Sequence, residues 1–190
     1  MRHRVSHIFV MQSRIHSPVH CLWRTLSTGI PVTVKLLYVC THNACRSILA
    51  EVLTRATLND RVQVRSAGSS PGGQVHPLTL RYLEEHGYST AGLASESLGA
   101  MREFDPDIVV TVCDSAAGEA CPVWLAPAAR VHWGLPDPSR AEGDDNARLA
   151  AFEPVVQIIA NRLSALSKMD LTDADAGQLA AAMQELEAVS

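Results

Sequence analysis

The chain has 190 residues, of which 47% are hydrophobic and 19% are charged, a composition typical of one globular domain with a sizeable core. No stretch approaches the roughly 20 consecutive apolar residues that a membrane helix needs, so the sequence predicts no membrane span. The net charge is −4, and because residues 1–33 contain four Arg and no Asp or Glu, the remaining chain carries −8 and is poorly suited to binding nucleic acid.

Residues 1–33 form a basic segment without a periodic apolar pattern, and we expect a disordered extension with no part in the chemistry. Two other interpretations stay open. The segment has the Arg-rich, acid-free composition of a transit peptide, and it also fits translated sequence upstream of the natural start. It lacks a continuous apolar core followed by a small-residue cleavage site, so a secretory signal is not expected.

The number of cysteines is odd, and the chain has no secretory signal, which favours a reducing, cytoplasmic location where thiols are kept for chemistry. These cysteines are Cys21, Cys40, Cys45, Cys113 and Cys121. Their spacing lacks the paired C-x2-C of structural zinc sites, so redox use is the better hypothesis. We expect no metal ion on these thiols and no cofactor.

The first predicted strand leads into the most informative motif of the chain. Residues 36–39 form an apolar run typical of a buried parallel strand, and residues 44–58 have helical spacing. Between them, five residues separate Cys40 from Arg46, so the loop can curl until its N–H groups, the guanidinium and the helix start surround one anion. A thiolate facing a bound tetrahedral oxyanion is a nucleophile, and Ser47 can orient it. The alternative is a buried strand cysteine followed by a helix-capping turn.

The oxyanion-binding residues expected from this motif are the loop residues and the arginine that follows them: Thr41, His42, Asn43, Ala44, Cys45 and Arg46.

The remaining pattern alternates strands with helices, which predicts an α/β fold. Strands are expected at 62–66, 107–113 and 129–133, and helices at 77–86, 144–166 and 176–189. Loops are expected at 69–73, 92–104 (with a short helix) and 114–121, where small polar residues suggest mobility. Pro154 lies inside the predicted long helix, and we expect it either to kink the helix or to restart it. Thr172 and Asp175 have the spacing of a capping box for the last helix.

Two side chains follow strands at positions where open α/β sheets bind ligands. Cys113 ends the strand 107–113, and in a parallel sheet it would lie at the same edge as Cys40. Asp137 follows the strand 129–133 and could serve as a general acid there. An Asp before Pro is also a common turn former, and this second interpretation is favoured for Asp137 taken alone.

Together, the motif Val-Cys-Thr-His-Asn-Ala-Cys-Arg-Ser, the pair Cys113 and Cys121, and His-Trp-Gly-Leu-Pro-Asp-Pro resemble the low-molecular-weight tyrosine phosphatase superfamily, most of all its arsenate reductase branch. The resemblance covers about residues 34–166, which leaves 167–190 as a C-terminal helical tail. It implies a three-layer fold, a four-stranded parallel sheet with helices on both faces. It also implies that Cys40 is the nucleophile, Arg46 the oxyanion clamp, and Asp137 the general acid.

The resemblance to thioredoxin-coupled members implies a cysteine relay and a role in arsenic resistance. Cys40 attacks arsenate, Cys113 attacks Cys40 and releases arsenite, and Cys121 then attacks Cys113. The second pair is one residue further apart here than in the family pattern. The expected partners are an arsenate or phosphate-like oxyanion and a reductant, either thioredoxin or a glutaredoxin or low-molecular-weight thiol. In some relatives a monovalent cation binds at the positions of Asn43, Glu51 and Ser66.

Two other functions stay open at this point. A tyrosine phosphatase would hydrolyse phosphotyrosine through a cysteinyl-phosphate intermediate, although Ser139 and Arg140 stand here where phosphatases usually carry aromatic residues. A non-catalytic anion-binding or redox-sensing protein would need an inert site, and the combination of Cys40, Arg46 and Asp137 argues against that.

Overall fold

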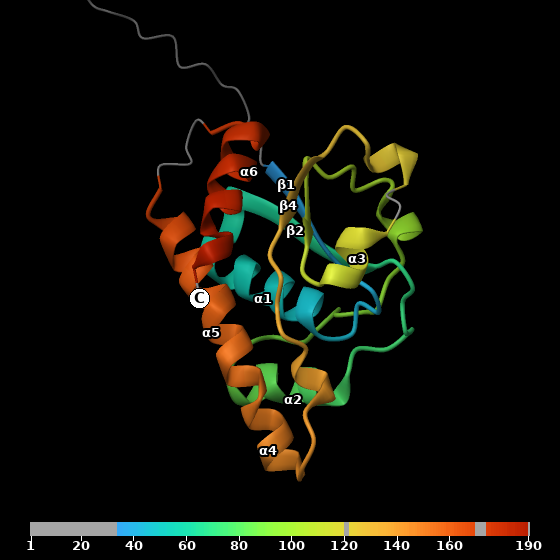
Figure 1. Ribbon diagram of the computed structural model, residues 1–190, viewed down its shortest axis with the longest axis vertical. Helices are drawn as coiled ribbons and strands as arrows, with labels where there is room; N and C mark the ends of the chain where they lie inside the picture. Colours follow the sequence, from blue (N-terminus) through green and yellow to red (C-terminus); the bar gives the residue numbers. More distant parts are fainter. Residues whose placement is uncertain (1–33, 120–121, 170–173, 190) are drawn as a thin grey trace, which may run out of the picture. The chain divides into compact units, whose positions relative to one another are not determined.

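The computed structural model describes residues 34–119, 122–169 and 174–189, apart from the side chain of Asp60. Its centre is a four-stranded sheet with the order β2-β1-β3-β4, in which all neighbouring strands are parallel (Figure 1). The strands are β1 Val34–Cys40, β2 Val62–Gly68, β3 Ile108–Thr111 and β4 Ala129–His132. The predicted four-stranded parallel α/β fold is therefore confirmed. The extension 1–33 lies outside the described residues.

The sequence of each strand matches its place in the sheet. The central strand β1 is apolar on both faces, and Leu36, Leu37 and Tyr38 are fully buried. The edge strand β2 begins with alternating exposure: Val62 and Val64 are buried, whereas Gln63 and Arg65 are exposed. Buried parallel strands read as continuous apolar runs, whereas edge strands alternate, and this explains both patterns.

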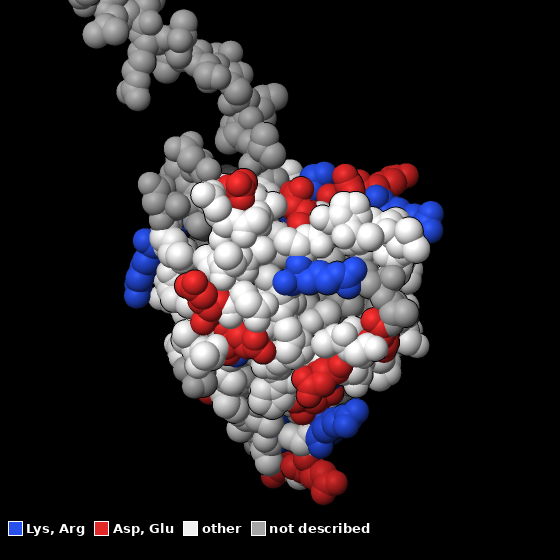
Figure 2. Space-filling model, turned by 45° about the horizontal axis from the view of Figure 1, so that its top comes forward, with Lys and Arg blue, Asp and Glu red and all other residues white. Residues whose placement is uncertain are grey.

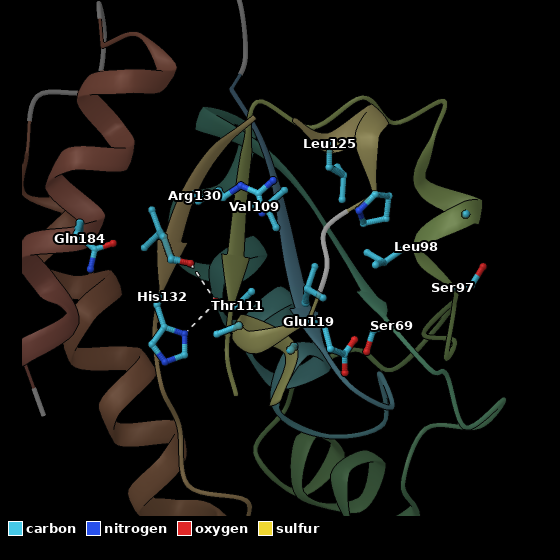
Figure 3. A pocket seen from close by; sticks show the side chains of 16 residues that line it. Ser69, Ser97, Leu98, Val109, Thr111, Glu119, Leu125, Arg130, His132 and Gln184 are labelled. Carbon is cyan, nitrogen blue, oxygen red and sulfur yellow. Dashed lines mark hydrogen bonds between the residues drawn. The ribbon is translucent and has the colours of Figure 1, made fainter. Parts of the chain in front are cut away.

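The described helices are α1 Arg46–Leu58, α2 Pro77–Glu85, α3 Asp114–Gly118, α4 Asp145–Ala150, α5 Phe152–Ser167 and α6 Ala176–Glu185. Helices α1, α5 and α6 cover one face of the sheet: Tyr38 contacts α1 through Thr54, and the ring of Trp133 contacts Arg162 of α5 and the Met183 carbonyl of α6. Helix α3 lies over the other face, where Val39 and Thr111 point (Figure 3).

Two predictions about local structure were wrong, whereas the expected restart of the long helix at Pro154 is confirmed. Residues 114–118 form a short helix and not a loop. The predicted helix 144–166 is two helices that break at Ala151, because Pro154 belongs to the first turn of α5, where a missing N–H leaves no hydrogen bond unmade. The capping box pairs Asp175 with Gln178, while Thr172 lies outside the described residues.

The last helix packs on the sheet. The indole N–H of Trp133 donates to the Met183 carbonyl at 2.7 Å, and the buried Arg162 donates to the carbonyls of Glu187 and Val189 at 2.6 and 2.9 Å. Leu179 and Met183 are buried. Helix α6 thus contributes to the core, and a domain boundary near residue 166 stays a prediction.

The surface shown in Figure 2 carries interspersed basic and acidic side chains. Among the described residues, no helix is long and apolar enough to cross a membrane.

Candidate active site

Cys40 lies at the end of β1 with its thiol surrounded by donors. The side chain is buried, the Ser47 hydroxyl oxygen is 3.1 Å from the sulfur, and the backbone N–H of Asn43 donates to the sulfur at 3.2 Å. Hydrogen bonds to the charged form of a group stabilise that form. The loop therefore places two hydrogen-bond partners around the Cys40 sulfur.

The segment that follows β2 holds the backbone carbonyls of the loop in an outward direction. The carbonyls of Cys40, Thr41, His42 and Ala44 accept hydrogen bonds from the N–H groups of Ser69, Ser70, Gly72 and His76, at 2.8 to 3.1 Å. Because the N–H of a peptide points away from its carbonyl, outward carbonyls leave the following N–H groups directed inward. We call residues 69–76 the outer belt of the loop. It prepares the loop to surround an anion.

Gly68 allows this close packing. A Cβ at position 68 would lie 2.7 Å from the Thr41 carbonyl oxygen and 3.1 Å from the Asn43 backbone nitrogen. Both atoms are parts of the loop itself, and the backbone oxygen cannot swing aside. The position therefore requires glycine, although its φ is not in the left-handed region.

Asn43 holds the loop from inside. Its φ of 46° is in the left-handed region, which Asn adopts more readily than most residues. Its side-chain NH2 donates to Ser47 at 2.9 Å and Ser66 at 2.8 Å, and its side-chain oxygen accepts from the Glu96 backbone N–H at 2.7 Å. These bonds fix the side chain and thereby the strained backbone.

Arg46 and Asp137 meet at the mouth of the loop although they are far apart in sequence. The guanidinium donates to the Asp137 carboxylate at 2.8 Å and to the Leu135 carbonyl at 3.3 Å. The other Asp137 oxygen accepts from the backbone N–H and the hydroxyl of Ser139, so Asp137 also has the turn-forming role considered for it. Arg140 approaches the carboxylate at 3.6 Å.

The remaining cysteines differ in their surroundings. Cys113 immediately precedes α3, is buried, and lies 3.7 Å from the Thr41 hydroxyl, so its thiol borders the loop. Burial raises the pKa of Cys45 to about 12, which keeps it a neutral thiol and unsuited to nucleophilic attack. Cys121 lies outside the described residues.

The structure also brings together Asn43, Glu51 and Ser66, the positions at which the resemblance suggested a monovalent cation. The Asn43 amide donates to Ser66, and the Ser66 hydroxyl donates to the Glu51 carboxylate at 2.6 Å. Among the described residues, no group of three or more His, Cys, Asp or Glu is arranged to hold a metal ion.

A separate cavity of about 500 Å³ lies behind α3 on the other face of the sheet (Figure 3). Val109 and Thr111 of β3 and the adjacent strands form its floor, and Ala116 of α3 is part of its wall. The Thr111 hydroxyl is 2.9 Å from the His132 ring, whose other nitrogen lies 3.3 Å from Asp114 in the first turn of α3. The cavity does not include Cys40 or Arg46.

Sequence reasoning missed the outer belt, the direct salt bridge between Arg46 and Asp137, and the salt bridge between Glu51 and Arg55. One signal was present: His76 was expected near the start of a helix, and its ring does accept the Leu78 N–H at 3.2 Å. Burial and the charge of Arg148 lower the pKa of His76, against the effect of Asp137, which suits a ring that accepts a hydrogen bond.

Comparison with known proteins gives similarity in sequence and in fold. The low molecular weight phosphotyrosine protein phosphatase family matches residues 35–176. An arsenate reductase of Halalkalibacterium halodurans is 34% identical over 133 residues, which make up 70% of this chain and 94% of that protein.

Two solved structures have the same fold. A thioredoxin-dependent arsenate reductase of Corynebacterium glutamicum superposes with a TM-score of 0.55 at 28% identity, over 72% of this chain and 61% of that one. An arsenate reductase in the phosphate binding state gives a TM-score of 0.58 at 27% identity, over 71% of this chain and 97% of that one.

Proposed function

This chain belongs to the low molecular weight phosphotyrosine protein phosphatase family, in its arsenate reductase branch, and we propose that it converts arsenate to arsenite with Cys40 as the nucleophile. The observation that carries the proposal is the geometry around Cys40. Its sulfur has two hydrogen-bond partners inside a loop whose carbonyls point outward, and Arg46 lies at the loop mouth.

The first step forms a sulfur–arsenic bond. The Cys40 thiolate attacks As(V), and one arsenate oxygen leaves as water after receiving a proton, for which Asp137 is the proposed donor. Arg46 forms a salt bridge with Asp137, and a tetrahedral dianion offers the guanidinium a stronger, two-point partner. Anion binding would thereby free the Asp137 carboxyl for proton transfer.

The next steps transfer two electrons from thiols to arsenic. The Cys113 thiolate attacks the Cys40 sulfur, the sulfur–arsenic bond breaks, and its electron pair leaves with arsenic as arsenite. Cys121 then attacks Cys113, which frees Cys40 and leaves a Cys113–Cys121 disulfide. The place of Cys113 beside Thr41 supports the first exchange. The second exchange rests on the sequence resemblance, because Cys121 lies outside the described residues.

We propose an external dithiol as the final electron donor. Thioredoxin is favoured because a similar solved structure is a thioredoxin-dependent arsenate reductase, and a glutaredoxin or low-molecular-weight thiol is the alternative. Such chemistry requires a reducing compartment, so we propose that the protein works in the cytoplasm.

Arsenite formation in a reconstituted thioredoxin and thioredoxin reductase system tests this mechanism, with a glutathione and glutaredoxin system in parallel. We expect Cys40→Ser to lose at least about a thousandfold in rate, as loss of a nucleophile does. Cys121→Ser should complete about one turnover and retain a Cys40–Cys113 disulfide, visible by mass spectrometry of peptides. Cys21→Ser is the control, because Cys21 has no place in the relay.

Full turnover by both Cys113→Ser and Cys121→Ser would contradict the relay and indicate direct reduction by an external thiol. Efficient phosphotyrosine hydrolysis without arsenite formation would instead support a phosphatase. The second function uses the same Cys40, Arg46 and Asp137, and the family as a whole is described by it. Against it, the residues after Pro138 at the mouth of the site are Ser139 and the exposed Arg140, and neither offers the aromatic ring that usually stacks on phosphotyrosine.

A further inference from the structure

A continuous chain of hydrogen bonds links the Cys40 thiol to a charged pair on the far side of α1. From Ser47 beside Cys40 it passes to Asn43 and then to Ser66, with distances of 2.8 to 3.1 Å. The Ser66 hydroxyl donates to Glu51 at 2.6 Å. We call this the Glu51 network, and all its members up to Glu51 are buried.

Arg55, one turn further along α1, contacts Glu51 at the other end of the network. The guanidinium of Arg55 forms a salt bridge with the second Glu51 oxygen. The Glu51 side chain is 8% exposed and the Arg55 side chain 47%. The network thus begins at a cation near the surface and ends at the nucleophile.

The direction of each hydrogen bond that Asn43 makes is fixed, and a thiolate at Cys40 fixes the direction of the bond from Ser47. The backbone N–H of Glu96 can only donate, so the Asn43 side-chain oxygen must face it and the NH2 must face the two serines. Ser66 accepts from Asn43 and gives its proton to Glu51. Ser47 also accepts from Asn43, and the partner for its own proton is the Cys40 sulfur. Ser47 is therefore a donor to the thiolate.

The Ser66 end of this network depends on the charge of Glu51. A carboxylate only accepts, whereas a protonated carboxyl can also donate, and it would then compete with the Asn43 NH2 for the Ser66 oxygen. Burial raises the pKa of Glu51, and the Ser66 hydrogen bond, the charge of Arg55 and the charge of Arg65 act against that rise. Of the two arginines, Arg55 is the one that forms a salt bridge with Glu51, and its positive charge favours the carboxylate form.

The same contacts decide whether a monovalent cation fits here. A hard cation takes oxygen ligands, several at once. Asn43 turns its NH2 and not its oxygen toward Ser66. The Ser66 hydroxyl donates its hydrogen bond to one Glu51 oxygen, and the other Glu51 oxygen accepts a hydrogen bond from Arg55. The residues expected to bind a cation do not fit one, and the guanidinium supplies the positive charge instead.

We propose that Arg55 is a built-in counter-cation: it takes the place of a bound monovalent cation beside Glu51 and, through the Glu51 network, positions the Ser47 proton on Cys40. Arg55 is a positioning residue, since it touches neither the substrate nor the sulfur. The inference rests on the proposed function only in taking Cys40 as the nucleophile.

The test measures the rate at which iodoacetamide alkylates Cys40 at neutral pH, followed by mass spectrometry of the Cys40 peptide. It needs no arsenate, and it compares buffers of equal ionic strength containing potassium chloride or choline chloride. The variants are Arg55→Ala and Arg55→Lys. The matched control is Arg81→Ala, because Arg81 and Glu85 form an i,i+4 salt bridge on α2 that is exposed on both sides.

We expect the unaltered protein to react equally fast in both salts. Arg55→Ala should react about tenfold more slowly in choline chloride, the size of one charge-assisted hydrogen bond, and should recover in potassium chloride. Arg55→Lys should retain most of the rate in either salt, and Arg81→Ala should react like the unaltered protein. Adding Glu51→Gln to Arg55→Ala should abolish the rescue by potassium.

Faster reaction of the unaltered protein in potassium chloride would overturn the inference, because the site would then take a cation. So would an Arg55→Ala protein indistinguishable from Arg81→Ala. A protein that showed the expected alkylation pattern and yet formed no arsenite would support the role of Arg55 and contradict the proposed function, so the two failures are separable.

Discussion

The oxyanion loop and helix α3 each bring a cysteine to the same edge of the sheet, but they are held in very different ways. Four carbonyls of the loop are tied to the outer belt by backbone hydrogen bonds, and Asn43 fixes the loop from inside. Helix α3 has five residues, a cavity behind it, and a contact between His132 and Asp114, whose side chain is 97% exposed.

The contrast matches the two kinds of chemistry proposed for the two cysteines. Stabilising a tetrahedral anion needs donors that are fixed before the substrate arrives, and the loop around Cys40 has them. Exchanging a disulfide from one sulfur to the next needs the attacking cysteine to move, and elements with few buried contacts open at the lowest free-energy cost. Cys113 stands at the start of such an element.

The largest expected effect comes from crowding the loop. Gly68→Ala would place a methyl group 2.7 Å from the Thr41 carbonyl oxygen, so the backbone of the loop must shift. We expect the free energy of unfolding to fall by about 2 kcal/mol and the rate of arsenate reduction to fall about a hundredfold. Urea denaturation and arsenite assays measure the two quantities.

Gly72→Ala is the matched control for Gly68→Ala. Its added methyl group would meet only the His42 carbonyl oxygen at 3.9 Å, an ordinary contact, and the substitution keeps the N–H that bonds to it. Equal losses in the two variants would show that the loop is not specially crowded at Gly68.

A smaller effect is expected from the same kind of change beside α3. Gly134→Ala would bring a methyl group to 3.1 Å from the His132 ring nitrogen and 3.7 Å from the Asp114 carboxylate, both at the ends of side chains that can move. The contact they make is exposed, so we expect less than about 1 kcal/mol of lost stability. Urea denaturation measures the loss.

Asp114→Ala should match Gly134→Ala and should add nothing to it in the double variant, since both remove the same contact. If Gly134→Ala lowered the free energy of unfolding as much as Gly68→Ala, the region around α3 would be as tightly packed as the oxyanion loop, which contradicts the comparison.

The smallest effect concerns pH at the outer belt. Because the folded state lowers the pKa of His76 below its ordinary value of 6.5, the unfolded chain binds the proton more readily. Stability is therefore full above that value and falls as the pH decreases through it. His76→Asn keeps a helix-capping side chain without a titrating group. Between about pH 8 and about pH 5, the unfolding free energy of this variant should therefore fall less than that of the unaltered protein, with a difference of a few tenths of a kcal/mol. Parallel pH profiles would contradict this.

Much of the fold followed from local patterns. The apolar runs of β1 and β3 and the alternation at the start of β2 were predictable because burial on both faces or on one face leaves a direct trace in the residue types. The errors came where tertiary contacts decided. The five residues of α3 are small, and a helix this short is stable only because it packs over the sheet. The last helix starts at the capping box formed by Asp175 and Gln178. Thr172 and Asp175 have the same spacing, and the prediction chose that pair instead.

The sequence by itself determined the chemical elements of the site: a cysteine at the end of a buried strand, an arginine six residues later at the start of a helix, and a serine beside it. Those residues are close in the chain, so short-range geometry was enough to predict an oxyanion loop. Only the tertiary structure decided what surrounds them. The outer belt, the Arg46–Asp137 pair and the Glu51 network join residues from different elements through directional hydrogen bonds. The direction of a hydrogen bond depends on which donor faces which acceptor in space, and no linear spacing records that.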